Sequence, residues 1–185
     1  MRLLPLFILM CINSFAQNIR MMGIGAQVFE PTGVNVQLYK GFFSMNNSMY
    51  ATYGVWELAL GIENATGIVG PKKYASGNWN KGGIRMDLNY LHPILTIKSP
   101  LVLQTYLGAG LQTGTRKYQL AGRDESNFST GANFMVRVEW VAHGFDIGPG
   151  KWFLSFYADI KYHKDFSESF DYISPVLGAR MRRGK

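Results

Sequence analysis

The chain has 185 residues, of which 47% are hydrophobic and 17% are charged, and its formal net charge is +7. The lysines and arginines are scattered along the whole chain, whereas a nucleic-acid-binding protein would gather them in one stripe, so we expect no nucleic-acid partner. The single cysteine, Cys11, excludes a disulfide within the chain, and the fold must be held by burial, hydrogen bonds and ion pairs.

The N-terminal segment has the pattern of a secretory signal peptide. Arg2 supplies the positive charge, residues 3–12 form an apolar run that is too short to span a bilayer, and Ser14 and Ala16 are the small residues of a cleavage site. These features predict an exported chain that is cleaved after Ala16, with residues 17–185 as one domain. A lipid anchor on the cysteine is the alternative, which the methionine before it disfavours.

After the signal segment, apolar residues alternate with polar ones, which is the period of a strand with two unlike faces. Val34, Val36 and Leu38 begin the clearest example. No apolar run in this part reaches the roughly 18 residues of a membrane helix. In chain order, the predicted strands cover residues 19–29, 34–41, 50–62, 83–96, 101–114, 131–141, 151–163 and 170–182.

The first two predicted strands are joined by a tight turn, Glu30-Pro31-Thr32-Gly33. Pro31 presets φ, and Gly33 tolerates the positive φ that such turns require. The chain can therefore reverse directly into the second strand.

Strand length and charge placement predict the fold. Most of these strands exceed the roughly 5 or 6 residues usual in soluble sheets and reach the roughly 9–11 that a tilted membrane-spanning strand needs. The charged residues share one face with glycines, glutamines and tyrosines, and the other face is almost free of charge. We therefore predict an all-β fold, a closed antiparallel up-and-down transmembrane β-barrel of about eight strands.

Charges that point into such a barrel are expected to form a network inside it. An eight-stranded barrel is wide enough only for its interior to fill with side chains, and a buried unpaired charge costs roughly 3–5 kcal/mol. This predicts a lumen plugged by ion pairs rather than a wide pore, with a gate or narrow ion path as the alternative. The predicted network consists of Glu57, Arg85, Asp87, Arg137, Glu139, Asp159, Lys161 and Arg180.

Alternation alone does not decide which face looks outward. An exported soluble β-sandwich or a lipocalin-like binding protein would show the same period with the faces exchanged. A lipocalin needs an apolar interior for its ligand, which is the reverse of the charge placement here. The barrel is favoured, and the soluble fold stays as an alternative.

The connections and the aromatic residues predict an orientation. With the N-terminus in the periplasm, the longest connections, residues 63–82 and 115–130, fall outside the cell, as is typical of outer-membrane barrels. Aromatic residues favour the membrane interface, and several lie at the periplasmic strand ends. The predicted girdle consists of Phe42, Phe43, Tyr50, Tyr90, Trp140 and Trp152. Core residues at hairpin ends are the alternative.

Four short motifs carry a resemblance to a known family. They are Phe15-Ala16-Gln17, Glu30-Pro31-Thr32-Gly33 before residues 34–39, Asn46-Asn47-Ser48, and Leu177-Gly178-Ala179-Arg180. In these the mature chain resembles the small outer-membrane barrels of the OmpX and OmpA-transmembrane type. The resemblance implies a monomer in the outer membrane of a Gram-negative bacterium, assembled by the barrel-assembly machinery and surrounded by lipid and lipopolysaccharide. It implies no catalytic residue and no cofactor.

The last strand departs from that family pattern in two respects. Pro175 lacks a backbone donor inside the strand and predicts a bulge or local unpairing there. The chain ends Arg182-Arg183-Gly184-Lys185 instead of in the aromatic residue that barrel assembly recognises in such proteins.

A lipid A-modifying enzyme is the competing functional class. Nucleophilic catalysis needs a serine within reach of an oriented base. His163 and Ser167 are predicted near the outer rim with Asp165 and Asp171, but the His-x-Ser arrangement of barrel deacylases is absent. We therefore expect a non-enzymatic protein.

The outer loops are the other place where function can lie. Residues 63–82 hold a candidate surface-binding set of cations and aromatics that could grip lipopolysaccharide phosphates or an extracellular partner, although a solvated loop is the default. These residues are Lys72, Lys73, Tyr74, Trp79 and Lys81. A further group at the outer side could in principle hold a divalent ion, but scattered acids on loops are usually solvated, and no metal is expected. This group is Asp124, Glu125, His163, Asp165, Glu168 and Asp171.

Overall fold

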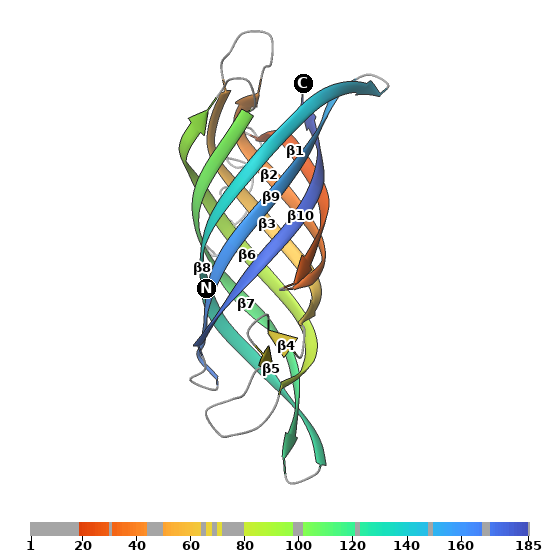
Figure 1. Ribbon diagram of the computed structural model, residues 1–185, viewed down its shortest axis with the longest axis vertical. Helices are drawn as coiled ribbons and strands as arrows, with labels where there is room; N and C mark the ends of the chain where they lie inside the picture. The colour runs from red at the N-terminus through yellow and green to blue at the C-terminus, as the bar shows by residue number, and fades with distance from the viewer. Residues whose placement is uncertain are drawn as a thin grey trace, which may run out of the picture.

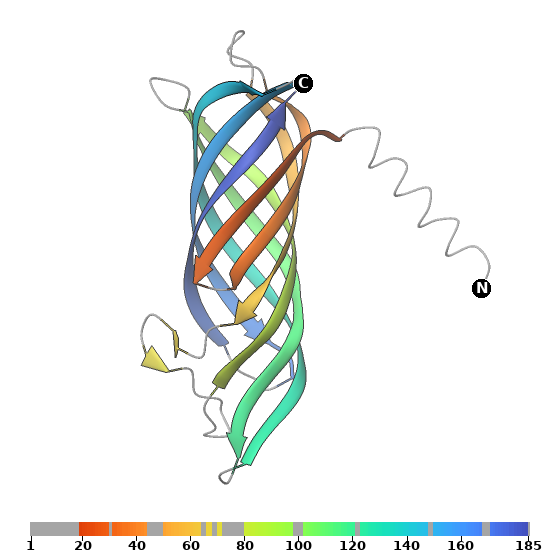
Figure 2. The ribbon, with the colours of Figure 1, turned by 90° about the vertical axis from the view of Figure 1, so that its right-hand side faces the viewer.

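The predicted barrel is confirmed. In the computed structural model, eight antiparallel strands close into a barrel in the order β1-β10-β9-β8-β7-β6-β3-β2, and β2 returns to β1 (Figures 1 and 2). The structure describes residues 19–29, 31–43, 50–63, 66–67, 70–71, 80–97, 102–120, 123–147, 150–167 and 171–184. The signal segment lies outside these residues.

The barrel strands are long, and their ladders with neighbouring strands are interrupted by a few register shifts. They are β1 (Ile19–Phe29), β2 (Thr32–Phe43), β3 (Tyr50–Glu63), β6 (Asn80–Ile97), β7 (Val102–Leu120), β8 (Arg123–Ile147), β9 (Gly150–Asp165) and β10 (Asp171–Gly184). A separate two-stranded sheet pairs β4 (Thr66–Gly67) with β5 (Gly70–Pro71). No helix long and apolar enough to cross a membrane is found in the described part of the chain.

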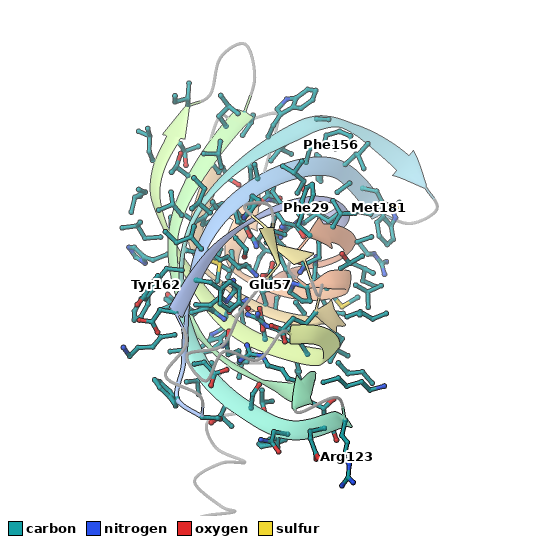
Figure 3. All side chains as sticks on the ribbon, turned by 60° about the horizontal axis from the view of Figure 1, so that its bottom comes forward. Phe29, Glu57, Arg123, Phe156, Tyr162 and Met181 are labelled. Carbon is teal, nitrogen blue, oxygen red and sulfur yellow. The ribbon has the colours of Figure 1, made fainter. Side chains whose placement is uncertain are left out.

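The two faces of each strand lie as the alternation predicts. Leu58, Leu88 and Leu111 form one cross-strand row on the outside and are 39%, 46% and 64% exposed. Glu57 and Asp87, their neighbours along β3 and β6, are fully buried. Figure 3 shows the same division, with Glu57 inside the barrel and the labelled side chains of the outer surface around it. The polar face of the sheet is therefore the interior.

The two ends of the barrel differ. We name the end where β1 begins and β10 ends the terminal end, and the opposite end the far end. At the far end β7 and β8 continue as a ribbon beyond the other strands, with the ladder running to Leu120 opposite Arg123 (Figure 2). The rim at this end is therefore uneven.

The long strands correct two predicted connections. Residues 115–120 and 123–130, predicted as a loop, belong to β7 and β8, and residues 142–147, predicted as part of a turn, belong to β8. The reason is that the sequence of residues 115–127 lacks an apolar face. β6 pairs with β7 as far as Tyr118, and the ladder of β9 with β8 begins only at Gly131. The strands predicted from apolar alternation are therefore too short.

The first turn also differs from the prediction. Positive φ occurs at Phe29, at 83°, and Gly33 is an ordinary strand residue. Gly33 is needed for a different reason, because a Cβ there would overlap the backbone of Leu60 and Gly61 on β3. The glycine thus allows β2 and β3 to approach closely, and the turn strain falls on the residue before Glu30.

The bulge or local unpairing predicted at Pro175 is not found in the ladder with β9, where Pro175 pairs with Ile160 without a register shift. The described ladder with β1 ends one residue away, at Val176. A register shift appears instead between β6 and β7, at Pro93/Leu95.

Candidate functional site: the charged interior of the barrel

The interior of the barrel contains a balanced set of charges. Among the described residues, the buried acids are Glu57, Glu63, Asp87, Glu139, Asp159 and Asp165, and the buried bases are Arg85, Arg116, Arg137, Lys161, Arg180 and Arg182. The two sets are equal in number, so the interior is formally neutral with His163 uncharged. All eight residues of the predicted network are in this set.

The centre of the interior is a bridge across the lumen made by one arginine. The guanidinium of Arg137 on β8 donates to both carboxylate oxygens of Glu57 on β3, at 2.6 and 3.0 Å. It also donates to both oxygens of Asp159 on the neighbouring β9, each at 2.6 Å. Planar paired contacts of this kind are the strongest that arginine forms. The bridge therefore ties opposite walls of the barrel together.

Amides complete the coordination of Glu57. Gln37 on β2 and Asn89 on β6 both donate to its carboxylate, the latter at 3.1 Å. Arg180 on β10 approaches the same carboxylate at 3.8 Å. Glu57 thus has partners from β2, β6, β8 and β10, which offsets the cost of burying its charge.

A second cluster lies between this bridge and the terminal end. Glu139 on β8 is paired with Arg182 and lies 3.4 Å from Arg180 Nε, and it accepts a hydrogen bond from Ser155 at 2.6 Å. The ring of Tyr157 lies between two guanidinium groups, with Arg137 4.3 Å and Arg180 3.8 Å from its centroid. Stacked cations of this kind hold the ring and the arginines in fixed positions.

A buried apolar cluster lies toward the terminal end of the interior, which the sequence interpretation missed. The buried cluster there consists of Tyr39, Val55, Leu91, Val102, Tyr106, Met135, Val141 and Phe153. Most of these residues lie near the terminal-end limits of their strands. The cluster is interleaved with charged residues, since Arg182 is the cross-strand partner of Phe153 and its guanidinium lies 4.4 Å from the centroid of the Tyr39 ring.

The far half of the interior holds a further set of pairs. Arg85 contacts Asp87 at 2.6 Å, and Lys161 lies 3.5 Å from the same carboxylate. Arg116 pairs with Glu63 at 2.8 Å and with Asp165. The sequence predicts loops at or beside Glu63, Arg116 and Asp165, because the predicted strands end before these residues.

A serine and a histidine meet in this half, although the sequence interpretation did not pair them. His163 Nε2 lies 2.8 Å from Ser174 Oγ, and His163 Nδ1 lies 2.7 Å from a guanidinium nitrogen of Arg85. The same Nδ1 also lies 3.0 Å from Gln112 Oε1, which can only accept, whereas the guanidinium of Arg85 can only donate. The two Nδ1 contacts therefore favour opposite tautomers of the ring.

The other predicted sites are placed only in part. Tyr90, Trp140 and Trp152 lie on the outward face near the terminal end, where Tyr90 packs on Trp56 with centroids 5.1 Å apart and Trp140 stacks on Phe156 at 5.5 Å. The side chains of Phe42, Phe43 and Tyr50 are outside the described set, as are those of the loop residues Lys72, Lys73, Tyr74, Trp79 and Lys81.

The group considered for a divalent ion is not brought together in the described residues. His163 and Asp165 point into the lumen, where Asp165 pairs with Arg116. Asp171 lies on the outer surface beside Lys164. The described part of the chain contains no cluster of three or more acidic, histidine or cysteine side chains suited to a metal ion.

Comparison with known proteins adds no assignment. No protein-family model, curated protein sequence or solved structure matches the chain.

Gly178 makes room for the stacked tyrosine and provides a test of the packing. A Cβ at Gly178 would overlap the Tyr157 ring, so Gly178→Ala must displace that ring from Arg137 and Arg180. Overpacking of this kind costs about 1–3 kcal/mol, and we expect that loss in the free energy of unfolding measured by urea titration. The same substitution in a Tyr157→Leu background should cost less, because the smaller side chain leaves space. Equal costs in both backgrounds would show that the ring is not the obstacle.

Proposed function

We propose that this protein is an outer-membrane barrel with an occluded lumen and a non-enzymatic, structural or surface-interaction role. The observation that carries the proposal is the inverted polarity of the fold. Among the residues that the structure describes, twelve buried charged side chains lie in the interior, and apolar side chains cover the outer surface. A soluble protein distributes these two classes the other way round.

The outer surface is far more apolar than the surface of a soluble monomeric protein. Ile84, Leu111 and Ile173 are 69%, 64% and 66% exposed, and they belong to three different strands. Every barrel strand has exposed apolar side chains of leucine, isoleucine, valine, phenylalanine or methionine. Apolar patches on soluble monomers rarely exceed about 300–600 Å². Hydrocarbon is the solvent in which such a surface is stable.

Two features support an occluded lumen. The apolar cluster and the Arg182–Glu139 pair lie toward the terminal end, and the Arg137 bridge crosses the middle. An eight-stranded barrel leaves little room beside such side chains. We therefore propose that the side chains inside the lumen form a structural plug.

The proposed location follows from the N-terminal segment together with the fold. The signal-peptide pattern ends at Ala16, shortly before β1 begins at Ile19. An exported β-barrel with an apolar exterior belongs in the outer membrane of a Gram-negative cell. The terminal end then faces the periplasm, and the β7–β8 ribbon faces outward among lipopolysaccharide. Insertion would depend on the barrel-assembly machinery.

Cell fractionation and gel mobility test the proposed location. We expect the protein in the outer-membrane fraction, with a compact band in SDS that shifts to lower mobility on boiling, because a closed hydrogen-bonded barrel resists SDS until heated. Recovery of the folded protein from the soluble periplasm would contradict the proposal.

Planar-bilayer recording tests the plug. We expect no conductance steps from the wild-type barrel, since the apolar cluster and the Arg137 bridge both block the path. A wide porin in the same bilayer serves as the positive control. Steps from the wild type would contradict the plug, and steps that appear only in Arg137→Ala would identify this arginine as a gate.

A further inference from the structure

Asn133 on β8 is fully buried, and neither polar atom of its side chain has a hydrogen-bond partner among the described residues. The amide can donate two hydrogen bonds and accept two. Buried polar groups in folded proteins are almost always bonded to protein or to ordered water. Asn133 therefore marks a place in the interior where a polar ligand is expected.

Two further unpartnered atoms lie beside Asn133. A Cβ on Gly110, the cross-strand partner of Asn133 on β7, would overlap Asn89 Oδ1, so this oxygen lies over the glycine. In the same way, Gln112 Nε2 lies over Gly131, two residues before Asn133 on β8. Neither atom has a hydrogen-bond partner in the described part of the chain. The two glycines thus let polar atoms of β6 and β7 lie next to Asn133.

Lys161 on β9 completes the set. It is the cross-strand partner of Met135, two residues after Asn133, and is therefore a diagonal neighbour of the asparagine. Its ammonium lies 3.5 Å from Asp87 Oδ2 but donates no hydrogen bond to a described residue. We name the five unpartnered atoms the Asn133 site. They are Asn133 Oδ1 and Nδ2, Asn89 Oδ1, Gln112 Nε2 and Lys161 Nζ.

The donors and acceptors of the Asn133 site decide which ligand fits. An ammonium and two amide nitrogens donate, and two amide oxygens accept. An anion would leave both oxygens unpaired, and it would add a charge to an interior whose described buried acids and bases are equal in number. A cation would meet the Lys161 ammonium. Water is neutral and both donates and accepts, so it satisfies every atom of the site.

We propose that the Asn133 site holds a cluster of ordered internal water molecules. Such waters typically make about three hydrogen bonds each to buried polar groups that are otherwise unpaired. The Arg137 bridge follows on the side of the terminal end, where Asn89 donates to Glu57 at 3.1 Å. The cluster therefore hydrates the plug on one side of the bridge without opening a path through it. Because the site lies inside the barrel, it does not depend on the medium around the barrel.

Nuclear magnetic resonance of the refolded, isotope-labelled barrel in detergent micelles tests the water cluster. We expect dipolar cross-peaks between water and the side-chain amides of Asn133 and Gln112, with the sign that marks slowly exchanging water. Gln37 is the internal control, because its side chain is also fully buried but is bonded to Glu57 and Tyr39, and it should give no such cross-peak.

Three outcomes of this measurement would overturn the proposal. The first is the absence of a water cross-peak at Asn133, and the second is a cross-peak of equal strength at Gln37. The third is an amide chemical shift at Asn133 or Gln112 that follows the chloride concentration, which would assign the site to an anion.

Matched variants separate water binding from packing. Asn133→Leu has nearly the same volume but no polar side-chain atom, and it should abolish the water cross-peak of Gln112. Asn133→Ser keeps a hydroxyl and leaves more space, so that cross-peak should persist. A cross-peak that persists in the leucine variant, or is lost in both variants, would overturn the site. If the leucine variant does not show the heat-dependent gel shift of a folded barrel, the comparison of Asn133 with Gln37 in the wild type decides.

Discussion

Arg137→Met should lower the free energy of unfolding by about 3–5 kcal/mol, the typical cost of leaving a buried charge without its partner. Arg137 makes four hydrogen bonds to Glu57 and Asp159, and its loss leaves two carboxylates facing each other in the interior. Both carboxylates are buried, so water cannot replace the guanidinium. The measurement is a urea titration of the barrel in detergent micelles, followed by tryptophan fluorescence.

A double variant serves as the control for this prediction. Adding Asp159→Asn to Arg137→Met restores equal numbers of buried acids and bases, and Glu57 keeps its contacts with Gln37, Asn89 and Arg180. The double variant should therefore recover part of the loss, because a balanced interior is more stable than an unbalanced one. A single variant that stays within about 1 kcal/mol of the wild type would show that the bridge contributes little. A double variant as unstable as the single one would assign the effect to lost packing instead of charge.

Leu88→Arg is expected to cost about 2–4 kcal/mol when the barrel folds into a bilayer, because the new charge would lie in the hydrocarbon layer. Leu88 is 46% exposed and stands in the outer row between Leu58 and Leu111. On a soluble protein the same exchange at an exposed site would change stability by no more than about 0.5 kcal/mol. The free energy of folding into vesicles is the quantity to measure.

A variant at a different depth along the barrel serves as the matched control for Leu88→Arg. Thr115 on β7 is exposed like Leu88 but lies near the far end. Thr115→Arg should cost about 0–1 kcal/mol, as expected for a position near the membrane interface. Equal costs for both variants, or no cost at either position, would contradict a membrane-spanning barrel.

The barrel was predictable because each strand keeps its two faces distinct over many residues. The burial of Glu57, Asp87 and Arg137 follows directly from their shared parity with glycine and glutamine. The strand ends were less predictable, since the β7–β8 ribbon has no apolar face to mark it. Arg116 was missed in consequence, and Glu63 and Asp165 were missed because the predicted strands end at residues 62 and 163.

The pairing inside the lumen could not be predicted from the sequence. Which charges meet depends on the stagger of the strands around the barrel, and a shift of two residues preserves every face while changing every partner. Arg137 and Glu57 are 80 positions apart in the chain and meet across the lumen. The apolar cluster was missed for a related reason, because Val55 and Leu91 lie on the face that otherwise carries polar residues.

The placement of two arginines on the last strand has a consequence for assembly. Glu57 and Glu139 lie on β3 and β8, whereas Arg180 and Arg182, which approach them, both arrive with β10. A chain that has arranged β1 to β9 but not yet β10 therefore has an acid excess in its interior. Closing the seam between β1 and β10 cancels that excess, and the register of the structure brings Arg182 and Arg180 beside Glu139. Ion pairing inside the barrel thus stabilises the closed barrel relative to a precursor in which β10 is not yet paired.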